Sequence, residues 1–268
     1  MQNMPKKELT IVKIGGNIID DASKLHLFLE KFNSIKGAKI LVHGGGKLAT
    51  EMSAKLGIEA KMVNGRRITD LKTLEIVVMV YSGINKSMAA MLSSMGAKSI
   101  GICGADLNLI PAAKRVKSDI DYGFVGDILS DKIPVNDWNI FLEAGICPVV
   151  APITADTSGQ LLNTNADTIA STLAQALSKL YSVRLIYCFE KNGVLKNQED
   201  ENSVLPIIKA QEYTELHRRK IISDGMIPKL DNAWEAVRQG VDKVIIGNAL
   251  HIEKLTSPTH VTGTLLIL

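Results

Sequence analysis

The sequence predicts an α/β protein whose helices cover a mainly parallel sheet. Short β-branched or apolar runs alternate along the chain with longer segments of helical periodicity, which is the pattern of consecutive βαβ units. The length agrees, because 268 residues, 46% of them hydrophobic, form one large domain or two closely joined lobes.

The predicted elements follow one another in a regular order. Apolar runs predict strands over 9–14, 39–42, 98–102, 146–150, 184–188 and 243–246. Apolar spacings of three and four predict helices over 21–35, 48–56, 70–95, 135–143, 167–177 and 229–239. The stretch 107–129 is typical of a β-hairpin, and a boundary between lobes 1–178 and 179–268 must cut a continuous sheet near Ser178.

Charge and cysteine content exclude several classes of protein. With 31 Lys and Arg against 28 Asp and Glu, the net charge of +3 is too small for a nucleic-acid-binding surface. Cys103, Cys147 and Cys188 lie far apart in apolar stretches, which predicts reduced core thiols. The chain shows no signal-peptide pattern and no apolar run of about 18 residues, so we expect a cytoplasmic protein without a membrane segment.

A lysine and two glycines close the first predicted strand. Lys13 ends the strand and Gly15 and Gly16 follow, at the edge where open α/β sheets bind ligands. Glycine lets backbone N–H groups approach a phosphate, and lysine adds a compact positive charge. An ordinary Gly-Gly turn would give the same pattern, so this motif alone does not establish a site.

The motif H-G-G-G at 43–46 repeats this arrangement after the second strand. Two of its glycines and Ala49 match the dinucleotide fingerprint, but that fingerprint belongs after the first strand of a fold. The acidic residue at a comparable distance, Asp70, stands at the start of a predicted helix. A packing role is favoured for His43, and the sequence contains no P-loop or protein kinase motif.

Three further motifs carry polar side chains. The hairpin motif N-G-R-R-I-T at 64–69 allows one arginine to bind a carboxylate while its neighbour points to water, or both to remain solvated. In N-T-N-A-D at 163–167, Asn165 is a candidate helix cap and Asp167 complements the helix dipole without needing another role. In D-G-M-I-P-K at 224–229, Lys229 opposes the dipole at a helix entrance, which favours a role in a site.

Taken in order, K-x-G-G at 13, H-G-G-G at 43, N-G-x-R-x-T at 64, N-x-N-A-D at 163 and D-G-M-I-P-K at 224 resemble the motifs of N-acetylglutamate kinases in the amino acid kinase family. The resemblance implies an open three-layer αβα sandwich, with the acylamino-acid site in lobe 1–178 and the ATP site in lobe 179–268. It also implies transfer of the γ-phosphoryl group of ATP to the side-chain carboxylate of N-acetyl-L-glutamate, in arginine biosynthesis. Mg²⁺ would be held mainly by the ATP phosphates, with no metal site of the protein's own.

The resemblance assigns a role to each matching residue. Lys13 and Lys229 would be the two cations on the transferring phosphoryl group, and Asp167 would hold both lysines. The residues expected to bind the substrate are Arg67 at its α-carboxylate, Asn163 at its acylamino group, and Gly44, Gly45 and Gly46 through N–H groups. The residues expected to contact ATP are Gly16, Glu190, Lys191, Asn192, Gly193, Ile221, Ile222 and Ser223. Arg66 fills a variable position and should face solvent.

One turn departs from the family pattern. The sequence C-F-E-K-N-G-V at 188–194 stands where the family usually has a Ser/Thr-Asp-Val turn, and Glu190 takes the place of the usual aspartate. Two alternatives to an acetylglutamate kinase follow, namely a kinase for another N-acylglutamate such as N-succinylglutamate, or a non-catalytic sensor of the same fold. A dinucleotide-dependent oxidoreductase would leave the other four motifs unexplained.

The predicted helix over 70–95 carries more apolar residues than one core-facing stripe uses. Ile76, Met79 and Val80 lie off the stripe that contains Leu74 and Val77. A second copy of the chain is the simplest cover, so we expect a homodimer through this helix. Only about eight residues precede the first strand, fewer than an isolated helix needs, so we expect no hexameric ring.

Overall fold

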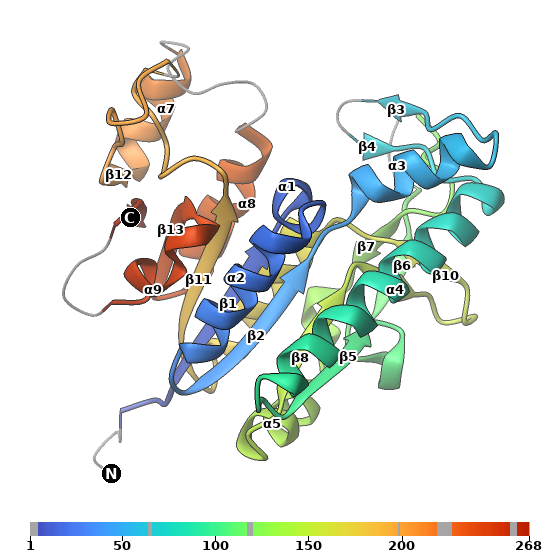
Figure 1. Cartoon of the computed structure of the whole chain (residues 1–268), viewed down its shortest axis with the longest axis horizontal. Helices are drawn as coiled ribbons and strands as arrows, with labels where there is room; N and C mark the ends of the chain where they lie inside the picture. The colour runs from blue at the N-terminus through green and yellow to red at the C-terminus, as the bar shows by residue number, and fades with distance from the viewer. Residues whose placement is uncertain are drawn as a thin grey trace.

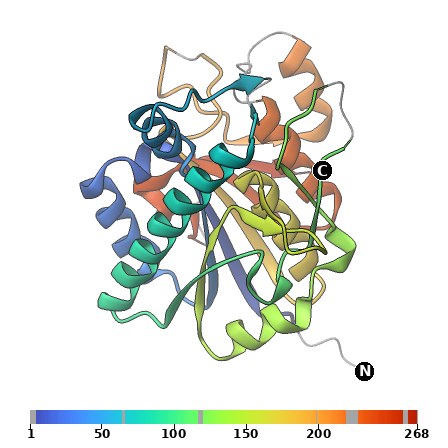
Figure 2. The same cartoon turned by 90° about the vertical axis from the view of Figure 1, so that its right-hand side faces the viewer.

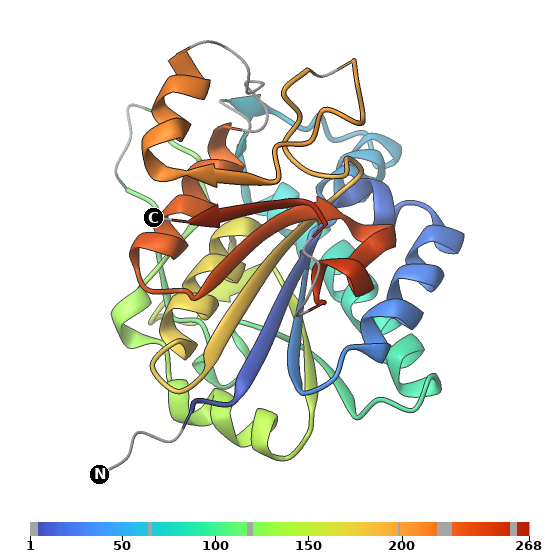
Figure 3. The same ribbon diagram turned by 90° about the vertical axis from the view of Figure 1, so that its left-hand side faces the viewer.

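The computed structural model describes residues 5–63, 66–116, 120–197, 199–218, 227–257 and 262–267, with the backbone alone for residues 217 and 227–229. An eight-stranded sheet runs through these residues in the order β12-β14-β13-β11-β1-β2-β8-β5. Neighbouring strands are parallel except for β13 and β14. Figure 3 shows the central strands side by side, from red β14 and β13 to blue β1 and β2.

The strands of this sheet agree with the predicted runs and add two at one edge. Their bounds are β1 Glu8–Ile14, β2 Ala38–His43, β5 Ser99–Cys103, β8 Cys147–Ala151, β11 Ser182–Phe189, β12 Ile207–Lys209, β13 Lys243–Asn248 and β14 Thr264–Ile267. The sheet continues across residue 178, and β11 to β14 all lie on one side of β1. The division into lobes at 178 remains a prediction.

Helices cover both faces of the sheet, as the α/β prediction requires. The described helices are α1 Gly16–Ile19, α2 Ala22–Ser34, α3 Gly46–Lys55, α4 Leu71–Ser94, α5 Val135–Glu143, α6 Ala166–Leu177, α7 Ala210–Arg218, α8 Ile227–Arg238 and α9 Ile252–Leu255, with short 3₁₀ turns at Asp106–Asn108, Ser130–Lys132 and Ala249–His251. Residues of α2, α4 and α9 share one core cluster, and residues of α5, α6 and α8 share the other. The result is a three-layer αβα sandwich (Figure 1).

Alternation along β1 divides its side chains between the two layers. Leu9 and Ile11 belong to the cluster that contains α6, whereas Val12 and Ile14 belong to the cluster that contains α2 and α4. Lys13 is two residues beyond Ile11 and therefore projects toward the α6 layer. This parity places the lysine on the same side of the sheet as the first turn of α6.

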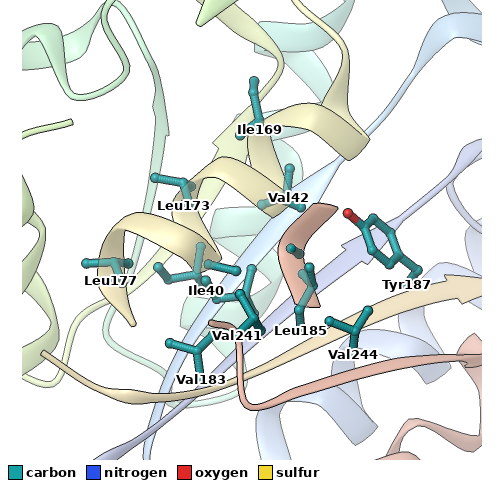
Figure 4. Packing of buried hydrophobic residues seen from close by; sticks show 14 of the residues in the cluster. Ile40, Val42, Ile169, Leu173, Leu177, Val183, Leu185, Tyr187, Val241 and Val244 are labelled. Carbon is teal, nitrogen blue, oxygen red and sulfur yellow. The ribbon is translucent and has the colours of Figure 1, made fainter. Parts of the chain in front are cut away.

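The α6 layer holds that turn in place through close packing. Figure 4 shows Ile169, Leu173 and Leu177, spaced four residues apart on α6, against Ile40 and Val42 of β2. All five side chains are fully buried. Burying an aliphatic side chain of this size stabilises a fold by about 1.5–3 kcal/mol, so the start of α6 is anchored firmly over the sheet.

Three small antiparallel hairpins lie outside the main sheet. They pair β3 Met62–Val63 with β4 Arg66–Arg67, β6 Ala112–Lys114 with β7 Gly126–Ile128, and β9 Ile153–Ala155 with β10 Leu161–Asn163. The hairpin predicted over 107–129 is confirmed from Ala112 to Ile128, although residues 117–119 lie outside the described part. Its predicted start is wrong, because Leu107 and Asn108 form a 3₁₀ turn with φ of 50° and 53°.

Helix α4 is the longest described helix, and Figure 2 shows it in teal on the opposite side of the sheet from α6, which is drawn in yellow. By length and composition alone this helix could cross a membrane, but its buried face packs on β5, β8 and neighbouring helices. Ile76 is buried within the chain, so it was wrongly counted among the residues that need a second copy. Met79 is exposed.

Candidate active site

Two cavities meet at the carboxyl ends of the central strands, where β1, β2 and β11 lie side by side. The first has a volume of about 370 Å³ and extends from the turn after β1 to Glu190 and Lys191 after β11. The second, of about 230 Å³, lies between the H-G-G-G turn, the β3–β4 hairpin and the start of α6. Lys13 lines both cavities. A ligand in each would therefore meet at this lysine.

Lys13 and Asp167 form a buried ion pair at this junction. Lys13 Nζ lies 2.7 Å from Asp167 Oδ1, and the two side chains are 8% and 12% exposed. Asp167 stands in the first turn of α6, where a negative charge also complements the helix dipole. Asn165 caps the same helix by accepting a hydrogen bond from Thr168 N at 2.9 Å, as predicted. The pair is thus held by both a strand end and a capped helix.

The hydroxyl of Tyr187 on β11 binds the backbone at the start of α6. It donates a hydrogen bond to the backbone carbonyl of Asp167 at 3.2 Å. Burial, and then the charge of Asp167, raise the pKa of this hydroxyl well above its usual value. Tyr187 therefore remains a neutral donor that fixes the backbone of the aspartate.

The two glycine turns lie against each other. Gly44 N donates to Ile14 O at 3.0 Å, and a β-carbon at Gly44 would be 3.9 Å from Gly15 Cα. Gly45 has φ of 151°, and a β-carbon there would be 2.8 Å from Ile84 Cδ1 of α4. Helix α3 then begins at Gly46, where backbone N–H groups have no partner within the helix. Gly45 therefore has no room for a side chain, and the Gly44 N–H, which was expected to bind the substrate, is already used by Ile14 O, which leaves the N–H groups of Gly45 and Gly46 for the smaller cavity.

Arg67 projects into the smaller cavity from the β3–β4 hairpin. It is 7% exposed, and its Nη2 donates to Gly46 O at 2.8 Å and to Thr50 Oγ1 at 2.6 Å. Its Nη1 is buried without a hydrogen-bond partner among the described residues. A buried, charged donor of this kind is costly unless a ligand oxygen accepts its hydrogen. Asn64 and Gly65, the turn of this motif, lie outside the described part.

Arg66 is exposed, as expected, but it also borders the smaller cavity. Burial, and then the nearby charge of Arg115, lower the pKa of its guanidinium from the usual value. The expectation that Arg66 only faces solvent is therefore too simple. Arg115 itself pairs with Asp127 across the second hairpin, with Nε 2.9 Å from Oδ1.

Arg115 and Asp127 line the smaller cavity and were missed by the sequence analysis. Their place depends on a close approach at Gly126, where a β-carbon would lie 2.5 Å from Thr164 Oγ1. The glycine at position 126, next to Asp127, was the feature of the sequence that could have suggested this close approach to Thr164.

Asn163 ends β10 at the far wall of the smaller cavity. Its Nδ2 donates to Thr69 Oγ1 at 3.1 Å, which leaves the side-chain oxygen for a donor on the ligand. Lys13, Arg67, Asn163 and the glycine turn, which the sequence analysis assigned to the transferring group and the substrate, thus surround one cavity.

The residues predicted to contact ATP are only partly brought together. Gly16, Glu190 and Lys191 line the larger cavity. Asn192 lines a separate cavity of about 420 Å³. Gly193 does not line either of them: a β-carbon there would be 2.7 Å from Thr264 Oγ1 and Val204 Cγ1, so this glycine serves packing.

Several predicted contacts fall on residues that the structure does not describe. Ile221, Ile222 and Ser223 lie outside the described residues, and so does the side chain of Lys229 near the start of α8.

The buried thiols and the buried imidazole of the central sheet supply no nucleophile or base. Burial raises the pKa of the Cys147 thiol to about 12 and that of Cys188 further still. Burial also lowers the pKa of His43 to about 4, which keeps its imidazole neutral at physiological pH. Within the described residues, no three Asp, Glu, His or Cys side chains cluster as a metal site.

A site of cations and glycine N–H groups at the strand ends of an αβα sandwich defines a protein that handles phosphates and carboxylates. The sequence profile of the amino acid kinase family matches residues 8–248, and the chain belongs to this family. It is 50% identical to the acetylglutamate kinase of Phocaeicola vulgatus over 90% of this chain and 93% of that one. It is 51% identical to the acetylglutamate kinase of Cytophaga hutchinsonii over 97% and 99%. The crystal structure of smu.665 from Streptococcus mutans matches 97% of this chain and 98% of that one, with 27% identity and a TM-score of 0.76.

Proposed function

We propose that this chain is an acetylglutamate kinase, which transfers the γ-phosphoryl group of ATP to the side-chain carboxylate of N-acetyl-L-glutamate. The observation that carries the proposal is the buried Lys13–Asp167 pair at the junction of two cavities. Relatives that are about 50% identical over nearly their whole length are named for the same activity. The product is an acyl phosphate, the activated carboxylate needed for arginine biosynthesis.

The smaller cavity is suited to the substrate dianion. Four cationic side chains line it, but Asp127 and Asp167 are its only carboxylates among the described residues, which leaves an excess of two positive charges. N-acetylglutamate carries two carboxylates and balances this charge. Arg67 Nη1 would bind the α-carboxylate, and the Asn163 side-chain oxygen would accept the acylamino N–H.

The reaction needs no general base. A carboxylate is ionised at neutral pH and attacks without losing a proton, so the neutral, buried His43 is not required to accept one. The difficulty is repulsion between the carboxylate and the triphosphate. Lys13 and Lys229 would stabilise the charge that develops on the transferring oxygens, and Asp167 would orient both lysines.

The larger cavity would hold ATP between the Gly15–Gly16 turn and the Glu190–Lys191 segment. Its lysines and glycine N–H groups fit phosphates, whereas the described residues contain no carboxylate cluster that would hold a metal by itself. Mg²⁺ would therefore be bound mainly by the ATP phosphates, whose charge it neutralises. Lobes 1–178 and 179–268 would bind the substrate and the nucleotide respectively.

No observation favours the two alternatives. The named relatives support the acetyl group over other acyl groups. A non-catalytic sensor would not need the Lys13–Asp167 pair, whose burial without a catalytic function costs desolvation energy.

We also infer a cytoplasmic homodimer assembled through α4. Leu71 and Met79 on this helix and Ile100 on the adjacent edge strand β5 are exposed, and a two-fold contact would cover them. Light scattering at micromolar concentration should give twice the 29.1 kDa chain mass. A monomer would contradict the interface.

Trapping the acyl phosphate with hydroxylamine tests the activity. Enzyme, ATP, Mg²⁺ and N-acetyl-L-glutamate should give the coloured hydroxamate. N-acetyl-L-glutamine is the matched control, because it keeps the α-carboxylate and the acyl group but has no side-chain carboxylate to phosphorylate. No hydroxamate with N-acetyl-L-glutamate, or an equal yield with the control, would contradict the proposed function.

A further inference from the structure

His43, Asn85 and Val149 form a buried polar chain that the proposed mechanism does not use. His43 ends β2, Asn85 lies in the middle of α4, and Val149 belongs to β8. All three residues are buried, and the first two are a histidine and an amide in an otherwise apolar layer. Buried polar groups are retained at a cost, so their hydrogen bonds need an explanation.

The contacts fix the orientation of each group in turn. Asn85 Nδ2 lies 2.8 Å from Val149 O, which can only accept, so this atom of Asn85 must be the amide nitrogen. The same Nδ2 lies 3.2 Å from His43 Nε2, and a nitrogen that faces an N–H donor must be the unprotonated ring nitrogen. The imidazole proton is therefore on Nδ1, which donates to Gly44 O at 2.6 Å.

This last hydrogen bond determines the orientation of a peptide group in the site. The C=O and N–H of a trans peptide point in opposite directions, so an inward Gly44 carbonyl turns the Gly45 N–H away from His43. Gly44, Gly45 and Gly46 line the substrate cavity, and the described residues provide no acceptor for the Gly45 N–H. If the Gly44–Gly45 peptide were reversed, the Gly44 carbonyl oxygen would face the bound anions, and the Gly45 N–H would not.

We propose that His43 and Asn85 are positioning residues, which hold the Gly44 carbonyl away from the cavity and so present the Gly45 N–H to the transferring phosphoryl group. This inference rests on the proposed function. Neither side chain touches the cavity, and both act through the glycine turn. Because a preorganised donor acts mainly on the transition state, its loss should lower kcat on the order of 100-fold and change KM little.

Two substitutions of His43 separate positioning from packing. In His43→Asn the side-chain amide replaces the Nδ1 atom and can still donate to Gly44 O, whereas in His43→Gln it reaches the Nε2 position and contacts Asn85. We expect His43→Asn to stay within about tenfold of the wild-type kcat and His43→Gln to lose on the order of 100-fold. Packing alone predicts the reverse order, because glutamine fills more of the imidazole volume. His43→Gln equal to or better than His43→Asn would overturn the proposal.

The tautomer provides a readout that needs no turnover and no variant. Nitrogen-15 NMR of the wild-type imidazole should show His43 protonated at Nδ1 only, and the exposed His26 is the control for an averaging ring. A proton on Nε2 of His43, or fast exchange of the proton between its two ring nitrogens, would overturn the proposed positioning role even if neither variant folds. Failure of the proposed function is distinct, because the wild type would then form no acyl phosphate.

Discussion

The two cavities that meet at Lys13 are built in opposite ways. In the substrate cavity, Lys13, Arg67 and Asn163 are each held by another side chain, namely Asp167, Thr50 and Thr69. On the nucleotide side, Glu190 and Lys191 are exposed, and Glu190 is held through its backbone carbonyl by Asn248 Nδ2 at 2.8 Å.

The difference shows where the residue type matters. Where the partner is buried, as Asp167 and Thr69 are, the side chain cannot change without leaving that partner unsatisfied, which costs about 1–3 kcal/mol. A residue held through its backbone can change its side chain freely. This explains how Glu190 can stand where the family usually has an aspartate, and it predicts large effects in the substrate cavity and small ones on the exposed turn.

Lys13→Ala should have the largest effect of the changes that test this contrast. We expect kcat to fall at least about 1,000-fold with little change in either KM, since the lysine acts on charge that develops in the transition state. Lys191→Ala is the matched control, because Lys191 lines the same larger cavity but is exposed and pairs with Glu201. If steady-state kinetics showed Lys13→Ala and Lys191→Ala to be equally active, the contrast between the substrate cavity and the exposed nucleotide turn would be wrong.

Asp167→Asn tests whether the aspartate is more than a helix-start residue. The substitution keeps the shape and removes the charge that orients Lys13, so we expect kcat to fall on the order of 100-fold in a folded protein. If the charge serves only the helix dipole, thermal unfolding will show a loss of about 0.3–1 kcal/mol and turnover will be normal. Asn165→Ala, which removes the cap alone, gives the stability reference.

Arg67→Ala should act on binding and leave turnover largely intact. The guanidinium contacts the α-carboxylate in both the ground state and the transition state, so we expect the KM for N-acetylglutamate to rise about 10- to 100-fold. Nucleotide affinity should be unchanged. Arg66→Ala, at the exposed neighbouring position, should shift the same KM less than about threefold. A larger shift for Arg66 than for Arg67 would reverse their assignment.

The buried His43 should make the protein less stable in acid. Its pKa is lowered from 6.5 to about 4, so the unfolded chain binds a proton between these values and the folded chain does not. Stability is therefore complete above pH 6.5 and falls as the pH is lowered toward 4, by about 3 kcal/mol. Urea unfolding of the wild type and of His43→Asn at pH 7 and pH 4 measures this difference. An equal acid loss in both proteins would show that another group is responsible.

Local patterns predicted the elements, but they predicted the site only in part. Lys13 and the glycine turns could be placed together because parallel strands end at one edge of the sheet. Alternation along a hairpin strand allowed one of Arg66 and Arg67 to point inward, but the choice of Arg67 came from the resemblance to the N-G-x-R-x-T motif and not from periodicity.

Other features depend on contacts between distant segments. Asn85 and His43 are 42 residues apart, and no spacing relates them. Arg115 reaches the cavity because Gly126 allows the hairpin to approach Thr164. Ile76 is buried, and α4 packs on α3 and β10 as well as on the sheet, so the buried face of this helix is wider than one stripe.

The central claim is that the side-chain carboxylate of the substrate attacks the γ-phosphorus of ATP directly. Phosphorus-31 NMR with N-acetylglutamate labelled with oxygen-18 in that carboxylate tests it. The claim predicts an acyl phosphate whose resonance is shifted by a bridging oxygen-18 atom, in the presence of both ATP and the labelled substrate. Release of unlabelled inorganic phosphate with N-acetylglutamate unchanged would contradict it.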